Sequence, residues 1–165
     1  MRKKIKMEER TLVLIKPDGL VKSLTGNIIT MLSETKLKIV GSKVVKVTRE
    51  LAEKHYGDLK NSLIKKFGEE KGKMVFENTL DYIQGKFHTD RVLAMVYKGK
   101  DAVKKIRELA GETNPEKASP VSIRGKYGRI HSETKVFENV IHCSDSAENA
   151  EREIALWFKK DEVVE

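Results

Sequence analysis

The apolar run at 92–97, Val-Leu-Ala-Met-Val-Tyr, constrains the fold more than any other stretch of this sequence. Its residues do not alternate between apolar and polar, and the charged residues Arg91 and Lys98 stand at its two ends. Such a run predicts a strand that is buried inside a sheet. It is also far too short to span a bilayer, which takes ~20 apolar residues in a helix. We therefore expect no membrane segment.

Further apolar patterns predict an alternation of strands and helices. Short apolar runs predict strands at 11–15, at 39–47 with an irregularity at Gly41, at 92–97 and at 140–142. Apolar residues at helical spacing predict helices at 25–36, from a cap at Thr48 to 59, once or twice within 60–90, at 102–110 and from a cap at Ser146 onward.

The sequence also predicts the form of two connections between these elements. The tetrapeptide Lys16-Pro-Asp-Gly19 predicts a turn in which Pro17 fixes φ and Gly19 allows a positive φ. Residues 112–138 show little periodicity and contain two prolines, so they predict a long loop. A loop of that length inside a compact domain is uncommon and usually functional.

The order of these elements is β-α-β, a helical insert, β-α, the long loop, and β-α. Two split β-α-β halves predict an α/β (α+β) fold, a ferredoxin-like sandwich in which helices lie on one face of a four-stranded antiparallel sheet. A small doubly wound sheet is the alternative. A chain of 165 residues suits one compact domain.

Charge and cysteine content narrow the class of protein. The net charge is +8, but lysines are spread among glutamates along the whole chain. This arrangement favours nucleotide phosphates or a simple soluble surface, so nucleic acid is not expected as the main partner. The single cysteine, Cys143, excludes an internal disulfide and fits a reducing compartment. Without a secretory signal, we expect a cytoplasmic protein.

The stretch Asn139-Val-Ile-His142-Cys-Ser144-Asp-Ser146 predicts a strand that ends at the start of a helix, with His142 at the junction. Glu153 lies about two helical turns further on, where its carboxylate could hydrogen-bond the imidazole and make the other ring nitrogen a better nucleophile. His142 could equally be a histidine whose ring is tucked under a helix cap. The residues alone leave both readings open.

Three cations could bind phosphate near this histidine. Lys16 ends the first strand, Arg107 lies near the end of a helix, and Arg124 lies in the long loop. Guanidinium groups bind phosphate oxygens in a fork geometry and neutralise charge during phosphoryl transfer. The sequence contains none of the usual nucleotide-binding glycine loops or zinc motifs. A metal site could still be assembled from His131, His142, Cys143 and Asp145, although no pair of them has a recognised ligand spacing.

Five segments of the sequence resemble the nucleoside diphosphate kinase family in the family's own order, and together they cover 9–158. They are Glu9-Arg-Thr-Leu-Val-Leu-Ile-Lys16-Pro-Asp-Gly19, Gly111-Glu-Thr-Asn-Pro115, Ser122-Ile-Arg-Gly125, Asn139 to Ser146, and Glu151-Arg-Glu153-Ile-Ala-Leu-Trp-Phe158. The resemblance implies transfer of the terminal phosphate of a nucleoside triphosphate, typically ATP, to a nucleoside diphosphate. The transfer would be ping-pong and would pass through a phosphohistidine on His142.

The resemblance also implies roles for individual residues. Beside His142, the catalytic group would comprise Glu153, which orients the imidazole, Ser144, Lys16 and Tyr56. The nucleotide-binding residues would be Lys16, Arg107, Thr113 and Arg124 toward the phosphates, Asn139 toward the ribose, and Val136 and Ile64 on the two sides of the base. Phe67 and Phe76 are alternatives to Ile64, because 60–91 is longer than the family pattern.

The resemblance implies Mg²⁺ as the cofactor, held mainly by nucleotide phosphates and water rather than by protein ligands. It also implies a homo-oligomer, a hexamer or a tetramer. The expected layout is a basic N-terminal extension at 1–8, which we expect to be flexible, the kinase domain at 9–158 and a C-terminal tail at 159–165. The alternative function is a catalytically weakened relative of the same fold that binds nucleotides or nucleic acid.

A few positions depart from the family pattern. Cys143 and Val121 stand where the family has small residues, Glu138 replaces a basic residue, and 125–135 is extended. None of these changes removes a matched catalytic group.

Overall fold

The computed structural model describes residues 8–165 and contains one four-stranded antiparallel sheet with the order β2-β3-β1-β6. Its strands are β1 (Glu8–Ile15), β2 (Lys38–Val45), β3 (Val92–Lys100) and β6 (Ile141–Cys143). A two-stranded sheet is formed by β4 (Arg129–Ile130) and β5 (Phe137–Glu138). The predicted ferredoxin-like sandwich is confirmed, and so is the irregularity near Gly41, where the register of β2 shifts. Residues 1–7, which hold most of the expected N-terminal extension, lie outside the described residues, and Glu8 already belongs to β1.

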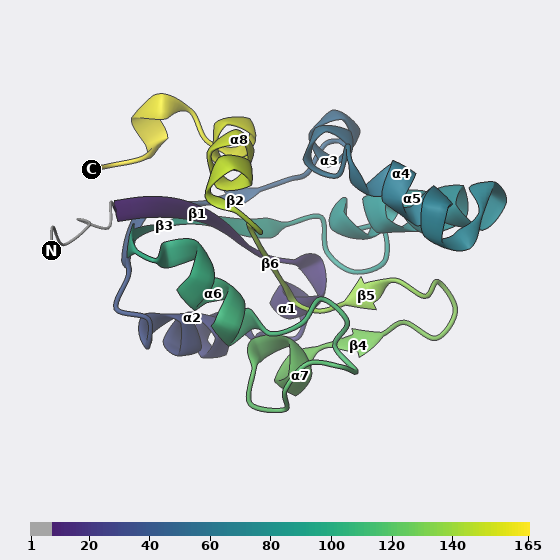
Figure 1. Ribbon diagram of the computed structural model, residues 1–165, viewed down its shortest axis with the longest axis horizontal. Helices are drawn as coiled ribbons and strands as arrows, with labels where there is room; N and C mark the ends of the chain where they lie inside the picture. Colours follow the sequence, from purple (N-terminus) through teal and green to yellow (C-terminus); the bar gives the residue numbers. More distant parts are fainter. Residues whose placement is uncertain (1–7) are drawn as a thin grey trace, which may run out of the picture.

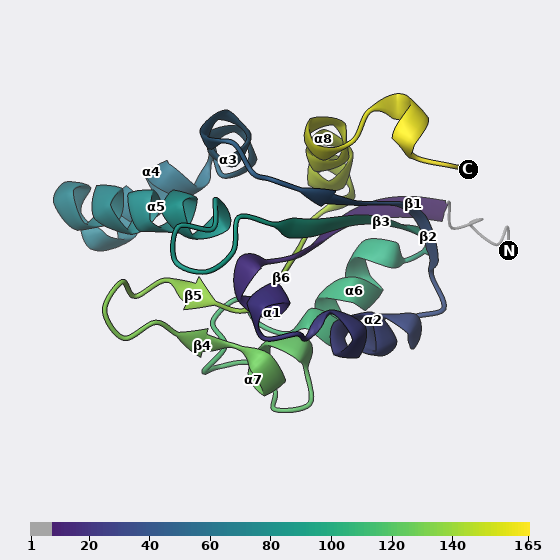
Figure 2. The same ribbon diagram turned by 180° about the vertical axis from the view of Figure 1, so that it is seen from behind.

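Helices cover both faces of this sheet, so the expectation of helices on one face was wrong (Figures 1 and 2). On β1, Leu12 and Leu14 join one core cluster, whereas Val13 and Ile15 join the other. The central strands are apolar on both sides because both sides are buried, which is why their runs do not alternate. One face packs against α3 (Arg49–His55), α5 (Glu69–Ile83) and α8 (Ala147–Trp157), and the other against α2 (Thr25–Ser33) and α6 (Ala102–Ala110).

The turn expected after β1 is a short helix, α1 (Pro17–Val21). Pro17 suits the first helical position because its missing N–H would have no partner there. Gly19 therefore does not adopt the positive φ that a glycine allows. Gly19 is needed for space instead, because an added Cβ would lie 3.0 Å from Ile15 Cγ2 and 3.1 Å from the Val140 carbonyl oxygen.

Two hairpins project from the edge of the sandwich, one helical and one of short strands (Figure 1). The helical hairpin joins α4 (Leu59–Phe67) to α5 through Gly68, which has a φ of 85°. It is the predicted insert. The other hairpin is β4–β5. The long loop expected at 112–138 thus contains this hairpin and a five-residue helix, α7 (Ile123–Tyr127), elements too short to show a period in the sequence.

Caps at three helix ends are confirmed. The Thr48 hydroxyl accepts from the Leu51 N–H, the Ser146 hydroxyl accepts from the Asn149 N–H, and Gly111 closes α6 with a φ of 83°. At the C-terminus a 3₁₀ turn (Lys160–Glu162) lies against β2, where the Val164 N–H donates to the Val40 carbonyl. Within 8–165, no helix is long and apolar enough to cross a membrane.

Candidate active site

The expected strand at 140–142 begins one residue later, because Val140 has a φ of 60°. A left-handed backbone is strained for a β-branched residue and persists only where the surroundings hold it. Here the Val140 N–H donates to Asp18 Oδ2 at 3.1 Å, and its carbonyl accepts from the Lys16 N–H at 2.9 Å. The buried carboxylate of Asp18 and the end of β1 therefore fix the bend between Asn139 and His142.

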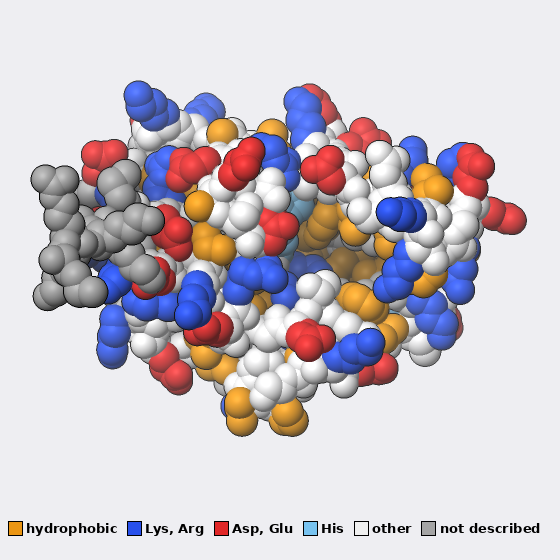
Figure 3. All heavy atoms as spheres, viewed as in Figure 1, with side chains coloured by type: hydrophobic (Ala, Val, Ile, Leu, Met, Phe, Trp, Pro, Cys, Tyr) orange, Lys and Arg blue, Asp and Glu red, His pale blue; other side chains and the backbone are white. Residues whose placement is uncertain are grey.

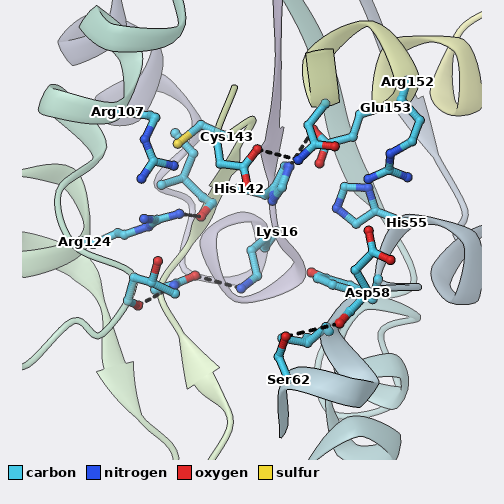
Figure 4. A pocket seen from close by; sticks show the side chains of 17 residues that line it. Lys16, His55, Asp58, Ser62, Arg107, Arg124, His142, Cys143, Arg152 and Glu153 are labelled. Atoms are coloured by element: carbon cyan, nitrogen blue, oxygen red, sulfur yellow. Dashed lines mark hydrogen bonds and ion pairs between the residues drawn. The ribbon is translucent and has the colours of Figure 1, made fainter. Parts of the chain in front are cut away.

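His142 lies on β6 and meets the carboxylate of Glu153, which reaches back from α8 (Figure 4). His142 Nε2 lies 3.0 Å from Glu153 Oε2. The Ser144 hydroxyl donates to the same oxygen at 2.6 Å and accepts from the Leu12 N–H. His142 of β6 and Ser144, which also contacts β1, thus both bind one carboxylate oxygen of Glu153 on α8. The sequence analysis had grouped these three residues.

The hydrogen bonds of Glu153 determine the form of the imidazole. Burial alone would raise the pKa of Glu153, but the bonds from His142 and Ser144 hold it below its usual value. The carboxylate is therefore ionised and can only accept, so His142 Nε2 must carry the proton that it donates. Nδ1 then keeps its lone pair, and within 8–165 it has no hydrogen-bond partner. In the neutral imidazole, Nδ1 is therefore the ring nitrogen whose lone pair is free.

A second histidine, His55, lies against His142, and the sequence reading did not assign it a role. The two ring centroids are 4.4 Å apart, with the planes at 75°. Trp157, one turn beyond Glu153 on α8, donates its indole N–H to His55 Nδ1 at 3.1 Å. Burial, followed by the neighbouring His142, lowers the pKa of His55 to about 3. His55 is therefore neutral, and its one signal in the sequence was a position on the apolar face of a predicted helix.

Lys16 is buried beside the histidine and is fixed by three groups. Its Nζ donates to Asn139 Oδ1 at 2.7 Å and to the Phe137 carbonyl at 3.2 Å, and it lies 4.7 Å from the centre of the Tyr82 ring. Burial lowers the pKa of Lys16 to about 8. Asn139 in turn donates to the Thr113 carbonyl at 2.7 Å. Lys16, Asn139 and Thr113 thus form one connected chain.

The two arginines differ in how firmly they are held. Arg124, on α7, is buried, and it donates to the carbonyls of Gly111 and Ile141 at 2.9 and 3.2 Å. Its Nε is buried without a partner among the described residues. Burial lowers the pKa of Arg124. Arg107 is exposed at the end of α6 and is free to follow a ligand.

These groups surround a cavity of about 360 Å³, the histidine cavity (Figure 4). Residues of α3, α4, α6, α7, α8 and β6, and of the loops that connect the elements, line it. Those that the sequence predicted are Lys16, Tyr56, Arg107, Thr113, Arg124, Asn139, His142 and Glu153. Burial raises the pKa of Tyr56, so its hydroxyl stays protonated and can donate.

A second, more apolar cavity of about 570 Å³ adjoins the first. The two hairpins form its walls, and Figure 3 shows the hollow between them lined by hydrophobic side chains. Val136 lines it, as predicted. The structure does not bring Ile64 to either cavity, because its main chain packs on Gly72 of α5, where an added Cβ would lie 2.5 Å from Ile64 Cα. Leu63 and the alternative Phe67 line this apolar cavity instead.

The other alternative for the base, Phe76, belongs to the main hydrophobic core. Leu63, which lines the apolar cavity, directly precedes Ile64, the residue to which the resemblance pointed. The helical face that contains Leu59, Leu63 and Phe67 was the available signal.

The metal site considered from the sequence is not assembled among residues 8–165. His131 lies in the β4–β5 hairpin, where its Nδ1 accepts from the N–H groups of Glu133 and Thr134. The one histidine and carboxylate cluster of this part of the chain is His55, His142 and Glu153. It is poorly suited to a metal, because the Trp157 N–H occupies Nδ1 of His55 and leaves the proton on Nε2.

Cys143, next to His142, is buried in the core cluster that contains Val13 and Ile15, and burial raises the pKa of its thiol. It is therefore a packed thiol rather than a thiolate.

An oriented imidazole with a free nitrogen, facing buried cations in a cavity of this size, suits one class of chemistry, the transfer of phosphoryl groups. The fold and the site define a phosphotransferase.

The chain belongs to the nucleoside diphosphate kinase family, whose sequence profile matches residues 9–163. A nucleoside diphosphate kinase of Pyrococcus furiosus is 46% identical over 157 residues, covering 95% of this chain and 87% of the relative. The crystal structure of an NDP kinase from Pyrobaculum aerophilum matches with a TM-score of 0.84 at 32% identity and covers 96% of this chain and 100% of that one. A transition state mimic of the nucleoside-diphosphate kinase from Borrelia burgdorferi, with bound vanadate and ADP, has a TM-score of 0.80 at 30% identity and covers 96% and 91%. The chain is an enzyme that transfers the terminal phosphate of a nucleoside triphosphate to a nucleoside diphosphate.

Proposed function

We propose that Nδ1 of His142 carries the phosphate between the two nucleotides. Its lone pair attacks the γ-phosphorus of the triphosphate, the bond to the β–γ bridging oxygen breaks, and the diphosphate leaves. A terminal oxygen of the second diphosphate then attacks the phosphorus and releases the imidazole. The observation that supports this assignment is the bond from Nε2 to the ionised Glu153, since it leaves the lone pair on Nδ1.

The cations would bind the phosphates on either side of the reacting nitrogen. Arg107, Thr113, Arg124 and Lys16 all line the histidine cavity. Buried cations stabilise the charge that spreads over the phosphoryl oxygens during transfer, with no reorganisation at the moment of reaction. The Tyr56 hydroxyl, kept protonated by burial, would donate to the same oxygens.

The ribose and base would extend from Lys16 toward the apolar cavity. Asn139 lies where the two cavities meet, and its amide side chain suits ribose hydroxyls. The base would lie between Val136 on one hairpin and Leu63 and Phe67 on the other. Apolar walls grip a base by its faces and do not read its edge, which fits a reaction that accepts every common base.

Mg²⁺ fits this site as a partner of the nucleotide. Two carboxylates, Asp58 and Asp145, line the histidine cavity, and the third, Glu153, is already engaged by His142. No all-oxygen cage exists here among residues 8–165. Mg²⁺ usually keeps water and binds phosphates with few protein ligands, and it would neutralise charge on the β- and γ-phosphates.

We also propose a homo-oligomer, a hexamer or a tetramer, in the cytoplasm. The support for assembly is β2, an edge strand that exposes Ile39 and Val44. Free Cys143 fits a reducing compartment. The proposed layout is a domain at 9–158 between a short N-terminal extension and the tail at 159–165.

The test of the phosphohistidine is incubation with γ-labelled ATP alone, followed by a nucleoside diphosphate. We expect one phosphate per chain, labile in acid and stable in alkali, that is discharged onto any common diphosphate. His142→Gln should take no label, whereas the matched control His131→Gln, in the β4–β5 hairpin, should label normally. Label retained by His142→Gln would refute the assignment.

A further inference from the structure

Lys16 is a buried cation without a carboxylate partner. It is almost fully buried, and among residues 8–165 it forms no ion pair. Its Nζ donates to two neutral oxygens, those of the Asn139 side chain and the Phe137 main chain. An ammonium has three N–H groups, so one of them has no acceptor in the described part of the chain. Because a buried charge is costly unless its surroundings compensate it, a further stabilising group is expected beside Lys16.

The ring of Tyr82 lies beside this ammonium. Tyr82 belongs to the last turn of α5 and is almost fully buried, and the centre of its ring lies 4.7 Å from Lys16 Nζ. The face of an aromatic ring carries negative potential and attracts a cation within about 6 Å, most strongly where water is excluded. The contact between Tyr82 and Lys16 is therefore a cation–π interaction in the setting where such interactions are strongest.

The ring of Tyr82, and not a phenolate, makes this contact. Burial, followed by the charge of Asp18, raises the pKa of Tyr82 well above its ordinary value, so the hydroxyl stays protonated. That hydroxyl is buried and has no hydrogen-bond partner among the described residues. The ring is braced by His88 instead, whose ring meets it edge to face at 6.1 Å and whose Nε2 lies 2.6 Å from Glu138. Tyr82 is thus held by α5 and by the anchored loop that follows it.

We propose that Tyr82 is a positioning residue for phosphoryl transfer, whose ring face holds the Lys16 side chain in its charged form where the two cavities meet. The inference rests on the proposed binding of phosphate by Lys16. Without the ring, the buried amine would lose its proton more readily, and a neutral amine does not neutralise phosphoryl oxygens. Tyr82 lines the apolar cavity and not the histidine cavity, so it acts on the phosphates through Lys16.

Other charged groups also act on Lys16 from the elements around it. Burial lowers its pKa to about 8, Asp18 of α1 and Glu138 of β5 favour the charged form, and Arg124 of α7 opposes it. The titratable groups that share the histidine cavity with Lys16 include His55, Tyr56, Arg107, His142 and Glu153. A change confined to the ring of Tyr82 leaves all of these groups in place. A shift in the titration of Lys16 then reports the ring.

The test weakens the face of the ring and nearly preserves its shape. Tyr82→Phe keeps the ring and removes the unbonded hydroxyl, and one, two or three fluorine atoms on that phenylalanine withdraw electron density from its face. NMR of the enzyme with isotope-labelled lysine follows the protonation of Lys16, and Lys16→Met identifies its signal. We expect Tyr82→Phe to titrate as the wild type does. The midpoint should then fall with each fluorine, by about one pH unit across the series.

The rate of phosphoenzyme formation from γ-labelled ATP is a second measurement. Because the pKa of Lys16 is about 8, a fall of about one unit lowers its charged fraction about fivefold at pH ~8 but only by about a tenth at pH ~6. The trifluorinated variant should therefore react about fivefold more slowly than Tyr82→Phe at the higher pH and equally fast at the lower one. The same trifluorinated residue in place of Phe87, outside both cavities, is the matched control and should change neither measurement.

The outcomes separate this inference from the proposed function. A midpoint of Lys16 that stays constant across the fluorinated series, or rates that fall equally at both pH values, would overturn the role of the ring. A midpoint that falls in Tyr82→Phe and no further would also overturn it, because the hydroxyl beside Asp18 would then be the acting group. A midpoint that follows the fluorines in an enzyme that forms no phosphohistidine would support the hold of the ring on Lys16 and count against the proposed function.

Discussion

The two ends of the site are built differently. The proposed reacting end, at His142, lies on the four-stranded sheet and is fixed by hydrogen bonds between β1, the end of β6 and α8. The base end lies between two peripheral hairpins and is walled mainly by apolar side chains. The difference follows from what each end must do. Phosphoryl transfer needs atoms placed within a fraction of an ångström, whereas a base whose edge forms no specific hydrogen bonds needs only a cavity between apolar walls.

Polar contacts nevertheless join the β4–β5 hairpin to α5 and to the loop after it, one of them from Asn78 Nδ2 to the Thr134 carbonyl oxygen at 3.4 Å. Glu138, almost fully buried at the base of β5, lies 2.6 Å from His88 Nε2 and 2.5 Å from Arg129 Nε. Burial alone would raise the pKa of Glu138, but these two partners hold it below its usual value. Glu138 stands where the family often has a basic residue, and here it joins the β4–β5 hairpin to the loop after α5. Glu138 is therefore a polar anchor of the β4–β5 hairpin.

The largest expected effect is at the reacting end. Glu153→Gln removes the ionised acceptor that sets the tautomer of His142. We expect the rate of phosphoenzyme formation to fall on the order of 10²–10⁴-fold, as for other orienting carboxylates, while ADP affinity changes little. Rapid-quench kinetics and calorimetry measure the two quantities. If ADP affinity fell as far as the rate, Glu153 would be structural and the contrast between the two ends would fail.

Lys16 should give a pH dependence of about tenfold. Burial lowers the pKa of Lys16 to about 8, so the side chain is an ammonium below that pH and neutral above it. Because phosphate binding needs the ammonium, kcat/KM should decline as pH rises through about 8. Bound phosphates favour the charged form and should shift the corresponding limb of kcat to higher pH.

The control for this limb is Lys16→Met, which should be slow at every pH and should lack the decline. A wild-type kcat/KM that stays flat to pH ~9.5 would contradict the assignment.

A smaller effect is expected at the base end. Phe67→Ala removes an aromatic wall of the apolar cavity, and we expect KM for ADP to rise about three- to tenfold with kcat nearly unchanged. Phe87→Ala, an exposed aromatic outside both cavities, is the matched control. A loss in kcat as large as the loss in KM would mean that the hairpin also positions the reacting groups.

The smallest effect concerns the anchor. His88→Gln weakens one of the two bonds to Glu138 and leaves Arg129 in place. We expect faster amide hydrogen exchange in 129–138, a change in KM of no more than about twofold, and unaltered exchange in β6. Faster exchange in β6 would show that the two ends of the site are mechanically coupled after all.

Much of this architecture could be predicted from local patterns. The apolar runs of β1 and β3, the caps at Thr48 and Ser146, and Gly111 each depend on a few neighbouring residues, and the structure confirms them. The insert was correctly predicted to be helical, but the residues of α4 that face the apolar cavity were not predicted. The resemblance pointed to Ile64, whereas α4 packs on Gly72 through Ile64 and brings Leu63 and Phe67 to the cavity. Which face of a helix meets its neighbour is a property of the pair, not of one segment.

The sequence by itself determined the chemical groups of this protein, namely a histidine at a strand end, its carboxylate two turns later and cations at recognisable spacings. Only the tertiary structure decided which nitrogen is free, since that depends on Glu153, Ser144 and Leu12 meeting from three elements. It alone placed neutral His55 against His142 and formed the apolar cavity between the two hairpins. These features arise from contacts between residues up to 132 positions apart, and no local pattern records such contacts.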